Sequence, residues 1–202
     1  MSIGASLQGI FRRSASTSDS IKHTATTNSL GLSERLMVQY RDTQSDQALS
    51  SLFDLHSNKL YYFLLVMSDA ATAEDIAQKV WVTVIEKRHQ FVNADNFQAW
   101  LFTIARRALI DEFRRNARID YDSDAVSKAP SDNIDIGETL TKSEAIHSLL
   151  CALPLKQKEA LSLQLEGLSL EQISAICHVP RETIKTRLRY ARETLKKITE
   201  RD

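Results

Sequence analysis

Cysteine, glycine and proline are scarce in this sequence, with 2, 5 and 3 residues among 202. Because glycine and proline are the commonest interruptions of helices, their scarcity favours long helices. The two cysteines, Cys151 and Cys177, stand in apolar surroundings without a CxxC pair, which excludes a disulfide framework and predicts small buried side chains in a reduced protein. No stretch approaches the roughly 20 apolar residues of a membrane span, and no apolar core follows Arg12 and Arg13, so no secretory signal is expected.

The hallmarks of enzymes are also missing. The sequence has no glycine-rich phosphate loop and no cluster of metal ligands, and its five histidines are scattered among unrelated contexts. We therefore expect a protein that is not an enzyme and that uses neither a cofactor nor a metal ion.

Charge is balanced in total but unevenly distributed. The 26 Lys and Arg cancel the 26 Asp and Glu, which gives a net charge of zero and a pI near 7.0. Residues 120–139 nevertheless carry six acids against Lys128, a net charge of −5. Together with Pro130 and Gly137, this composition predicts a flexible acidic linker over residues 119–139. The neutral total therefore hides an acidic segment and a basic one near the C-terminus.

The stretch Gly167–Lys197 predicts two helices joined by a tight turn. Ser169 is placed to cap the first helix, with Gln172 three residues later in the S-x-x-Q order of a capping box. Pro180 suits the first turn of the second helix, where no backbone N–H is needed. His178 stands where such a turn tends to need a left-handed backbone, which histidine tolerates at some cost.

The second of these helices separates apolar from basic side chains. Ile184, Leu188 and Leu195 fall at i, i+4 and i+11 and so share one face. Residues 181–197 hold seven Lys or Arg against two Glu, a net charge of +5. A basic helix supported by a short helix and a tight turn is the helix-turn-helix that enters the DNA major groove. The alternative is an amphipathic surface helix whose charged face is merely solvated; the threonines among the arginines favour DNA.

The rest of the chain predicts an all-α fold. Residues 1–46 are rich in Ser and Thr and predict a disordered N-terminal extension, with Met37 as an alternative start of the chain. Apolar residues at three- and four-residue steps predict helices elsewhere. These helices cover residues 47–67, 73–87, 96–118, 139–153 and 155–166. The expected organisation is two small helical domains, residues 47–118 and 140–202, joined by the linker.

Both domains resemble the bacterial ECF (extracytoplasmic-function) sigma factors. The first resembles their region 2 through DAATAEDIAQKVWVTVIEK and FQAWLFTIARRALIDEFRR, and the second resembles their region 4 through ALPLKQKEALSLQLEGLSLEQI and ETIKTRL. Two motif sets in the family's order and spacing are far more specific than a lone helix-turn-helix. The region 2 matches are Ala73-Glu74-Asp75, Gln78, Trp81, Phe97, Trp100-Leu101, Ile104-Ala105-Arg106, Asp111 and Arg114-Arg115.

The resemblance implies an alternative sigma factor, a subunit that directs RNA polymerase core to specific promoters for initiation. The implied partners are the beta-prime clamp and beta flap of the polymerase core, and promoter DNA, in the cytoplasm and without a membrane. Region 4 would read the minus-thirty-five element, because Arg can form two hydrogen bonds to guanine while Lys and Thr contact phosphates or base edges. The predicted contacts are Arg181, Thr183, Lys185, Thr186, Arg187, Arg189 and Arg192.

Region 2 would read the minus-ten element as a single strand. Unstacked bases need aromatic or amide pockets in a cationic setting. The predicted contacts are Asn93, Asn96, Phe97, Arg106, Arg107 and Arg114. Trp100 is interpreted mainly as a core residue.

The polymerase contact is assigned to the exposed side of the helix over residues 73–87. Its predicted residues are Glu74, Asp75, Gln78 and Lys79. The sequence departs from the family here, because Thr72 and Lys79 stand at positions that are usually acidic. Two hypotheses remain for Thr72: it caps the helix, with Asp75 at the third position, or it is phosphorylated to restore the missing charge. Control by a Ser/Thr kinase and control by an anti-sigma factor both stay open.

An alternative function is a helix-turn-helix regulator that does not act as a sigma subunit. That class of protein would use only the C-terminal domain and would carry a receiver or sensor domain before it. The pattern from Trp100 to Arg115 fits neither kind of domain.

Overall fold

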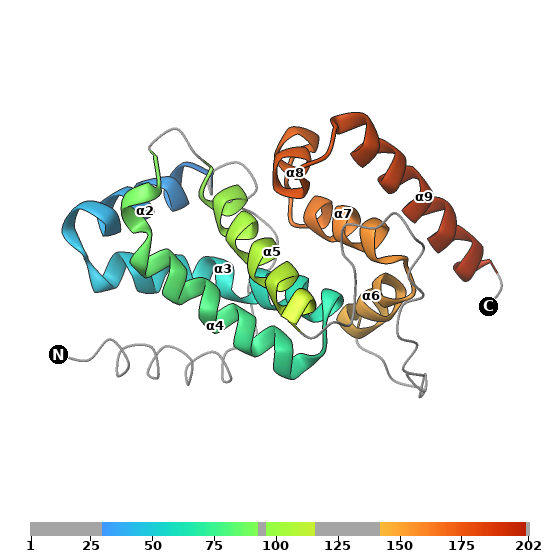
Figure 1. Cartoon of the computed structure of the whole chain (residues 1–202), viewed down its shortest axis with the longest axis horizontal. Helices are drawn as coiled ribbons and strands as arrows, with labels where there is room; N and C mark the ends of the chain where they lie inside the picture. The colour runs from blue at the N-terminus through green and yellow to red at the C-terminus, as the bar shows by residue number, and fades with distance from the viewer. Residues whose placement is uncertain (1–29, 93–95, 116–141, 201–202) are drawn as a thin grey trace.

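Helices make up all regular secondary structure in the residues that the structure describes, which are 30–92, 96–115 and 142–200. This computed structural model confirms the predicted all-α class (Figure 1). The predicted acidic linker, 119–139, lies outside the described residues. The elements are α2 (Leu30–Thr43), α3 (Asp46–Met67), α4 (Ala70–Glu86), the 3-10 turn η1 (Arg88–Gln90), α5 (Phe97–Arg115), α6 (Lys142–Cys151), α7 (Leu155–Leu165), α8 (Leu170–Cys177) and α9 (Arg181–Thr199).

Helix α2 corrects the sequence analysis. A disordered extension was expected over residues 1–46, but residues 30–43 are helical, while 1–29 lie outside the described part. Met37 is fully buried and Tyr40 is 5 % exposed, so α2 packs its apolar side against α3. The apolar stripe of α2 is short, and it follows a long run of polar residues, so the sequence pattern does not reveal it. Met37 lies in the middle of this helix, and Ser33 before it also contributes to the core.

The N-terminal unit is a bundle of α2, α3, α4 and α5. Its largest fully buried side chains come from all four helices and from the residue after η1, among them Trp81, Phe91 and Phe102. Side chains satisfy the free N–H groups at helix starts: Ser45 accepts from the Ala48 amide, and the Asn96 Oδ1 accepts from the Ala99 amide at 2.9 Å. Glu34 of α2 adds a second acceptor there, because its Oε1 accepts from the Phe97 amide at 3.0 Å.

The C-terminal unit, α6 to α9, contains the predicted helix-turn-helix. The capping box of α8 is confirmed: Ser169 Oγ accepts from the Gln172 amide, and Gln172 Oε1 accepts from the Ser169 amide. His178 ends α8 with φ 54°, the left-handed backbone expected at this turn. On α9 the apolar stripe is buried, with Ile184 and Leu188 at 0 and 2 % exposure.

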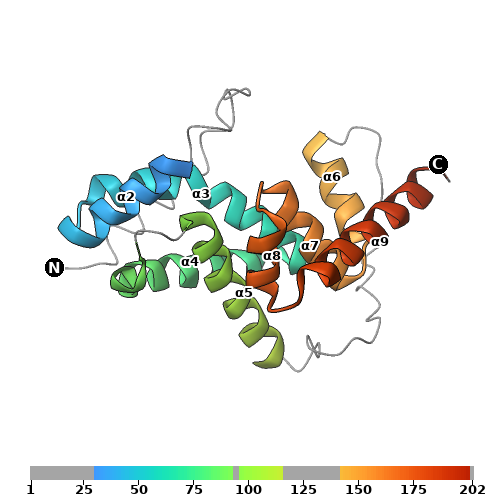
Figure 2. The ribbon, with the colours of Figure 1, turned by 90° about the horizontal axis from the view of Figure 1, so that it is seen from above.

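The two units pack against each other. Helix α5 lies along α8, and α3 contacts α6 and α7 (Figures 1 and 2). Buried residues of both units consequently belong to one continuous apolar cluster. Sequence analysis predicted the two units but not this contact, because a predicted linker says nothing about whether the domains it joins touch.

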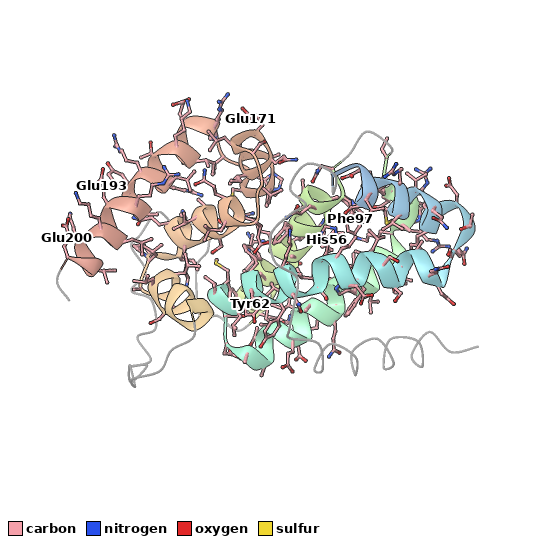
Figure 3. The ribbon with its side chains drawn as sticks, turned by 180° about the vertical axis from the view of Figure 1, so that it is seen from behind. His56, Tyr62, Phe97, Glu171, Glu193 and Glu200 are labelled. Carbon is pink, nitrogen blue, oxygen red and sulfur yellow. The ribbon has the colours of Figure 1, made fainter. Side chains whose placement is uncertain are left out.

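A buried histidine joins α2 to α3 inside the N-terminal bundle. His56 is 6 % exposed; its Nε2 lies 2.8 Å from Ser33 Oγ, and its ring packs edge-to-face with that of Phe97, with 5.1 Å between the ring centroids (Figure 3). Burial lowers the pKa of His56 from 6.5 to about 4, with a smaller contribution from Lys59. The imidazole is therefore neutral in the folded protein at neutral pH.

This histidine should make the protein less stable in mild acid. Because the folded pKa is depressed, the unfolded chain binds the proton first as the pH falls below 6.5. The free energy of unfolding should therefore fall between pH 6.5 and 4, by up to about 3 kcal/mol from this group. Urea denaturation at several pH values should show a flatter dependence for His56→Gln than for the wild type; parallel curves would contradict the prediction.

Candidate nucleic-acid and polymerase interface

The solvent-facing side of α9 is basic. The side chains of Arg181 and Lys185 are 52 and 46 % exposed, and Arg189 is 63 % exposed. All lie away from the buried stripe, as the periodicity predicts. The Arg189 guanidinium lies over the Tyr190 ring. Five of the seven predicted minus-thirty-five contacts are exposed on this helix. The exposed predicted residues are Arg181, Lys185, Thr186, Arg189 and Arg192.

Acidic side chains accompany these cations. Arg181 Nη1 lies 2.7 Å from Glu171 Oε1, and Lys185 Nζ lies 2.6 Å from Glu182 Oε1. Figure 3 shows Glu171 near the start of α8 and Glu193 farther along α9, on the outer side of the unit. Exposed ion pairs of this kind contribute less than about 1 kcal/mol, so a stronger anion can replace them.

Arg187 and Thr183 are less exposed than the other predicted contacts on α9. The Arg187 side chain is only 14 % exposed, and its Nη1 lies 4.0 Å from Glu159 Oε2. Thr183 is half-buried. In this arrangement the Arg187 guanidinium lies at a cleft rather than on the exposed face of α9, and its role in reading bases stays a prediction.

The predicted minus-ten residues are also divided. Phe97 is fully buried among His56, Phe91 and Trp100, so its ring is not exposed to a base in this structure, and its predicted contact with the minus-ten strand stays untested. Asn96 is engaged as the cap of α5. Asn93 lies outside the described residues.

The arginines of α5 border a cleft between the two units. Arg106 is 11 % exposed and forms a 2.7 Å ion pair from Nε to Glu159 Oε1. Arg107 and Arg114 are exposed and line the same cleft, whose volume is about 730 Å³. Lys156 faces them from α7.

Sequence analysis missed Glu159, which is 0 % exposed. Burial of the thiol raises the pKa of Cys177 on α8, and the negative charge of Glu159 adds to that rise. A signal was available: Glu159 falls at i+4 between Leu155 and Leu163, both buried, and therefore lies on the core-facing side of α7. A charged residue on such a stripe indicates a buried partner.

The predicted polymerase-facing residues of α4 are exposed. They are Glu74, Asp75, Gln78 and Lys79. Lys79 Nζ also lies 3.4 Å from Glu112 Oε2 on α5. The lysine at a usually acidic position is thus tied to the neighbouring helix.

Thr72 does not cap α4, so that interpretation is wrong. The cap is Asp69, whose Oδ1 accepts from the Thr72 amide at 2.9 Å. The Thr72 hydroxyl donates to Asp69 Oδ2, also at 2.9 Å. Thr72 therefore occupies the third position of the helix. The helix begins at Ala70, about one turn earlier than the sequence analysis predicted.

Comparison with known families decides the identity. Residues 52–119 match the family model for Sigma-70 region 2, and residues 143–195 match that for Sigma-70, region 4. The ECF RNA polymerase sigma factor EcfG of Rhodopseudomonas palustris (strain TIE-1) is 30 % identical over 156 residues, covering 76 % of this chain and 83 % of that protein. The chain belongs to the ECF sigma factors. It is an alternative sigma factor that directs transcription initiation.

Other relatives of this sigma factor agree. The ECF RNA polymerase sigma factor SigW of Bacillus subtilis (strain 168) is 29 % identical over 181 residues, covering 80 % of this chain and 96 % of that one. The sigma factor RpoE from Bartonella quintana, solved in complex with the anti-sigma factor NepR, is similar at a TM-score of 0.60 and 29 % identity. That match covers 75 % of this chain and 96 % of RpoE. Sigma factors are not enzymes, and no helix in the described residues is long and apolar enough to cross a membrane.

The capping geometry of α4 predicts different roles for two neighbouring residues of this sigma factor. Asp69→Ala should lower the free energy of unfolding by about 1 kcal/mol, because it removes the N-cap. Thr72→Ala should cost less, since its exposed hydroxyl bond is replaced by water. Urea denaturation of both variants checks this; an equal or larger loss for Thr72→Ala would contradict it.

Proposed function

We propose that this sigma factor reads the minus-thirty-five element with α9 and the minus-ten strand beside α5, and that it docks on polymerase core with α4. The exposed row of cations on α9 is the observation that carries the proposal. Cytoplasmic location follows from these partners.

For α9, the reading residues are those near its N-terminal end. In a helix-turn-helix this end reaches the base edges, while later residues approach phosphates. Arg181 has a guanidinium that can bind guanine through two hydrogen bonds once Glu171 releases it, and Lys185 follows one turn later. Arg189 and Arg192 are suited to phosphates. Arg192 currently donates to Gln164 Oε1 of α7 at 2.7 Å, which orients it.

For α5, Arg107 and Arg114 supply the positive charge that a single strand requires. Phe97, which is buried, would support this helix from inside the bundle. On α4, the acids Glu74 and Asp75 are the proposed contacts with the beta-prime clamp, and region 4 would meet the beta flap. A chain that binds DNA only as a regulator would need neither contact.

Initiation assays with purified polymerase core test this function. The wild-type chain should confer a defined start site on a promoter mapped from transcripts after forced expression. Arg181→Ala should lower that initiation about ten- to hundredfold, which corresponds to the loss of one bidentate base contact. Lys197→Ala, an exposed cation at the far end of α9, is the matched control and should change it little. Absence of any start site with core would favour the non-sigma regulator.

Thr72 is the proposed point of control. A phosphate on its Oγ1 would replace the hydroxyl bond to Asp69 and add a charge of about −1.5 to −2 at the first turn of α4. The Thr72 amide already donates to Asp69, so the positive end of the helix dipole is what favours an anion at this turn. The charge would stand where the family usually has an acid, and opposite charges fix the register of a contact. A Ser/Thr kinase would then take the place of an anti-sigma factor. The alternative, control by an anti-sigma factor, is supported by the similarity to RpoE, which was solved in complex with the anti-sigma factor NepR.

Pull-down of polymerase core tests whether phosphorylation of Thr72 regulates the protein. Kinase-treated wild type should retain at least several-fold more core than the untreated protein, while Thr72→Ala should not respond. Thr83→Ala, on the same helix, is the matched control and should respond like the wild type. If Thr72→Ala supports the same transcription as the wild type in induced cells, phosphorylation is not the switch.

A further inference from the structure

Helix α2 forms a hydrogen bond on each side of the connection between η1 and α5. Arg41 Nη1 donates to the Phe91 carbonyl oxygen at 2.9 Å, directly after η1. Glu34 Oε1 accepts from the Phe97 amide at 3.0 Å, at the first residue of α5 (Figure 3). Both bonds join a side chain of α2 to the main chain. The two ends of this connection are therefore attached to the same helix.

The two side chains come from one face of α2. Glu34 and Arg41 are seven residues apart, which is about two helical turns. Met37 lies between them on the same side and is fully buried in the bundle. Because α2 contacts both η1 and α5, the apolar packing that fixes this helix also fixes the reach of its two polar side chains.

A neighbouring acid orients the guanidinium of Arg41. Its Nε donates to Asp42 Oδ1 at 2.7 Å, and its Nη2 donates to Asp42 Oδ2 at 3.3 Å. Two parallel bonds to one carboxylate fix the plane of a guanidinium, so Nη1 is directed at the Phe91 carbonyl. The Asp42 side chain is 55 % exposed, and such a pair contributes little to stability. Its effect is on the direction of Arg41.

Aromatic rings anchor the same two ends from inside the bundle. Phe91 and Phe97 are 1 and 0 % exposed, and their ring centroids lie 6.0 Å apart. Both rings also contact Trp100, at 5.5 and 6.2 Å between centroids. Packing of this kind fixes the side chains, whereas the hydrogen bonds from α2 fix the peptide groups. The two kinds of contact are therefore not redundant.

One of these peptide groups belongs to a predicted minus-ten contact. The amide of Phe97 is part of the planar peptide that joins it to Asn96, so Glu34 holds the carbonyl side of Asn96 as well. The Asn96 Oδ1 accepts from the Ala99 amide, which leaves the Nδ2 group as the part of this side chain that can donate to a base edge. The direction of that group depends on the backbone that Glu34 holds.

We propose that Glu34 and Arg41 are positioning residues for the minus-ten readout. They touch no DNA; they fix the backbone on both sides of the connection before the strand binds. Ordering a backbone residue costs conformational entropy, and a connection whose ends are already fixed pays less of that cost on binding. Base-edge hydrogen bonds also weaken steeply when distance or angle changes. This inference rests on the proposed function. It extends the readout to α2, which lies before the residues 52–119 that match region 2.

The experiment compares initiation with polymerase core on the mapped promoter and on promoters that carry one substitution in either element. For the wild type, a minus-ten substitution should lower initiation about tenfold or more. For Glu34→Ala and Arg41→Met this ratio should shrink to about threefold or less, because a less fixed backbone distinguishes bases less well. The ratio for minus-thirty-five substitutions should stay at its wild-type value. A merely structural role would lower initiation on all promoters alike and change neither ratio.

Conservative variants provide the matched controls. Glu34→Gln keeps an oxygen that can accept from the Phe97 amide, so it should retain the wild-type ratio that Glu34→Ala loses. Arg35→Met removes an exposed arginine of the same helix and controls for Arg41→Met; it should also behave like the wild type. Asp42→Asn weakens the orientation of Arg41 at an exposed position and should shrink the minus-ten ratio in the same direction.

The outcomes separate this inference from the proposed function. Each ratio is measured with one protein preparation, so a partly unfolded variant still reports it. If circular dichroism shows that Arg41→Met is unfolded, Asp42→Asn tests the same end of the connection. A wild-type minus-ten ratio in Glu34→Ala and in the folded variant at the Arg41 end would overturn the positioning role and leave the proposed function standing. A wild-type protein that initiates without regard to the minus-ten sequence would refute the proposed function itself, and the inference with it.

Discussion

The desolvated ion pair between Glu159 and Arg106 joins the two units at the edge of the apolar cluster that they share. Moving a carboxylate out of water costs several kcal/mol, and only a well-placed cation offsets that cost. Arg106 supplies it at 2.7 Å from another unit of the fold. Within the C-terminal unit, Arg187 lies at the longer distance of 4.0 Å from this acid. The acid is therefore best satisfied when both units are together.

This interaction also explains why the surfaces of the molecule differ in accessibility. Most cations of α9 face solvent and meet only exposed acids, whose pairs are weak. Arg106 and Arg187 instead lie against the cleft, at 11 and 14 % exposure.

Much of the local structure could be predicted because it depends on near neighbours in the sequence. The capping box at Ser169 and the left-handed His178 are set by residues within one or two turns, and the apolar stripe of α9 follows from periodicity. Features that depend on distant residues could not be predicted. The burial of Phe97 and the pairing of Arg106 with Glu159 require knowing which helices meet. The prediction of where α4 begins failed for another reason. Asp69 and Thr72 are both good capping residues, and only the backbone conformation selects Asp69.

The carboxylate of Glu34 gives the N-terminal segment a significance beyond packing. It holds the first amide of α5 from a helix more than sixty residues earlier in the chain, and Asn96 holds the Ala99 amide beside it. A shortened polypeptide beginning at Met37 would keep every residue of the region 2 motif and still lose this tether. The first turn of α5 would then keep the Asn96 cap but lose the Glu34 acceptor, so the motif by itself does not delimit the smallest functional piece of the molecule.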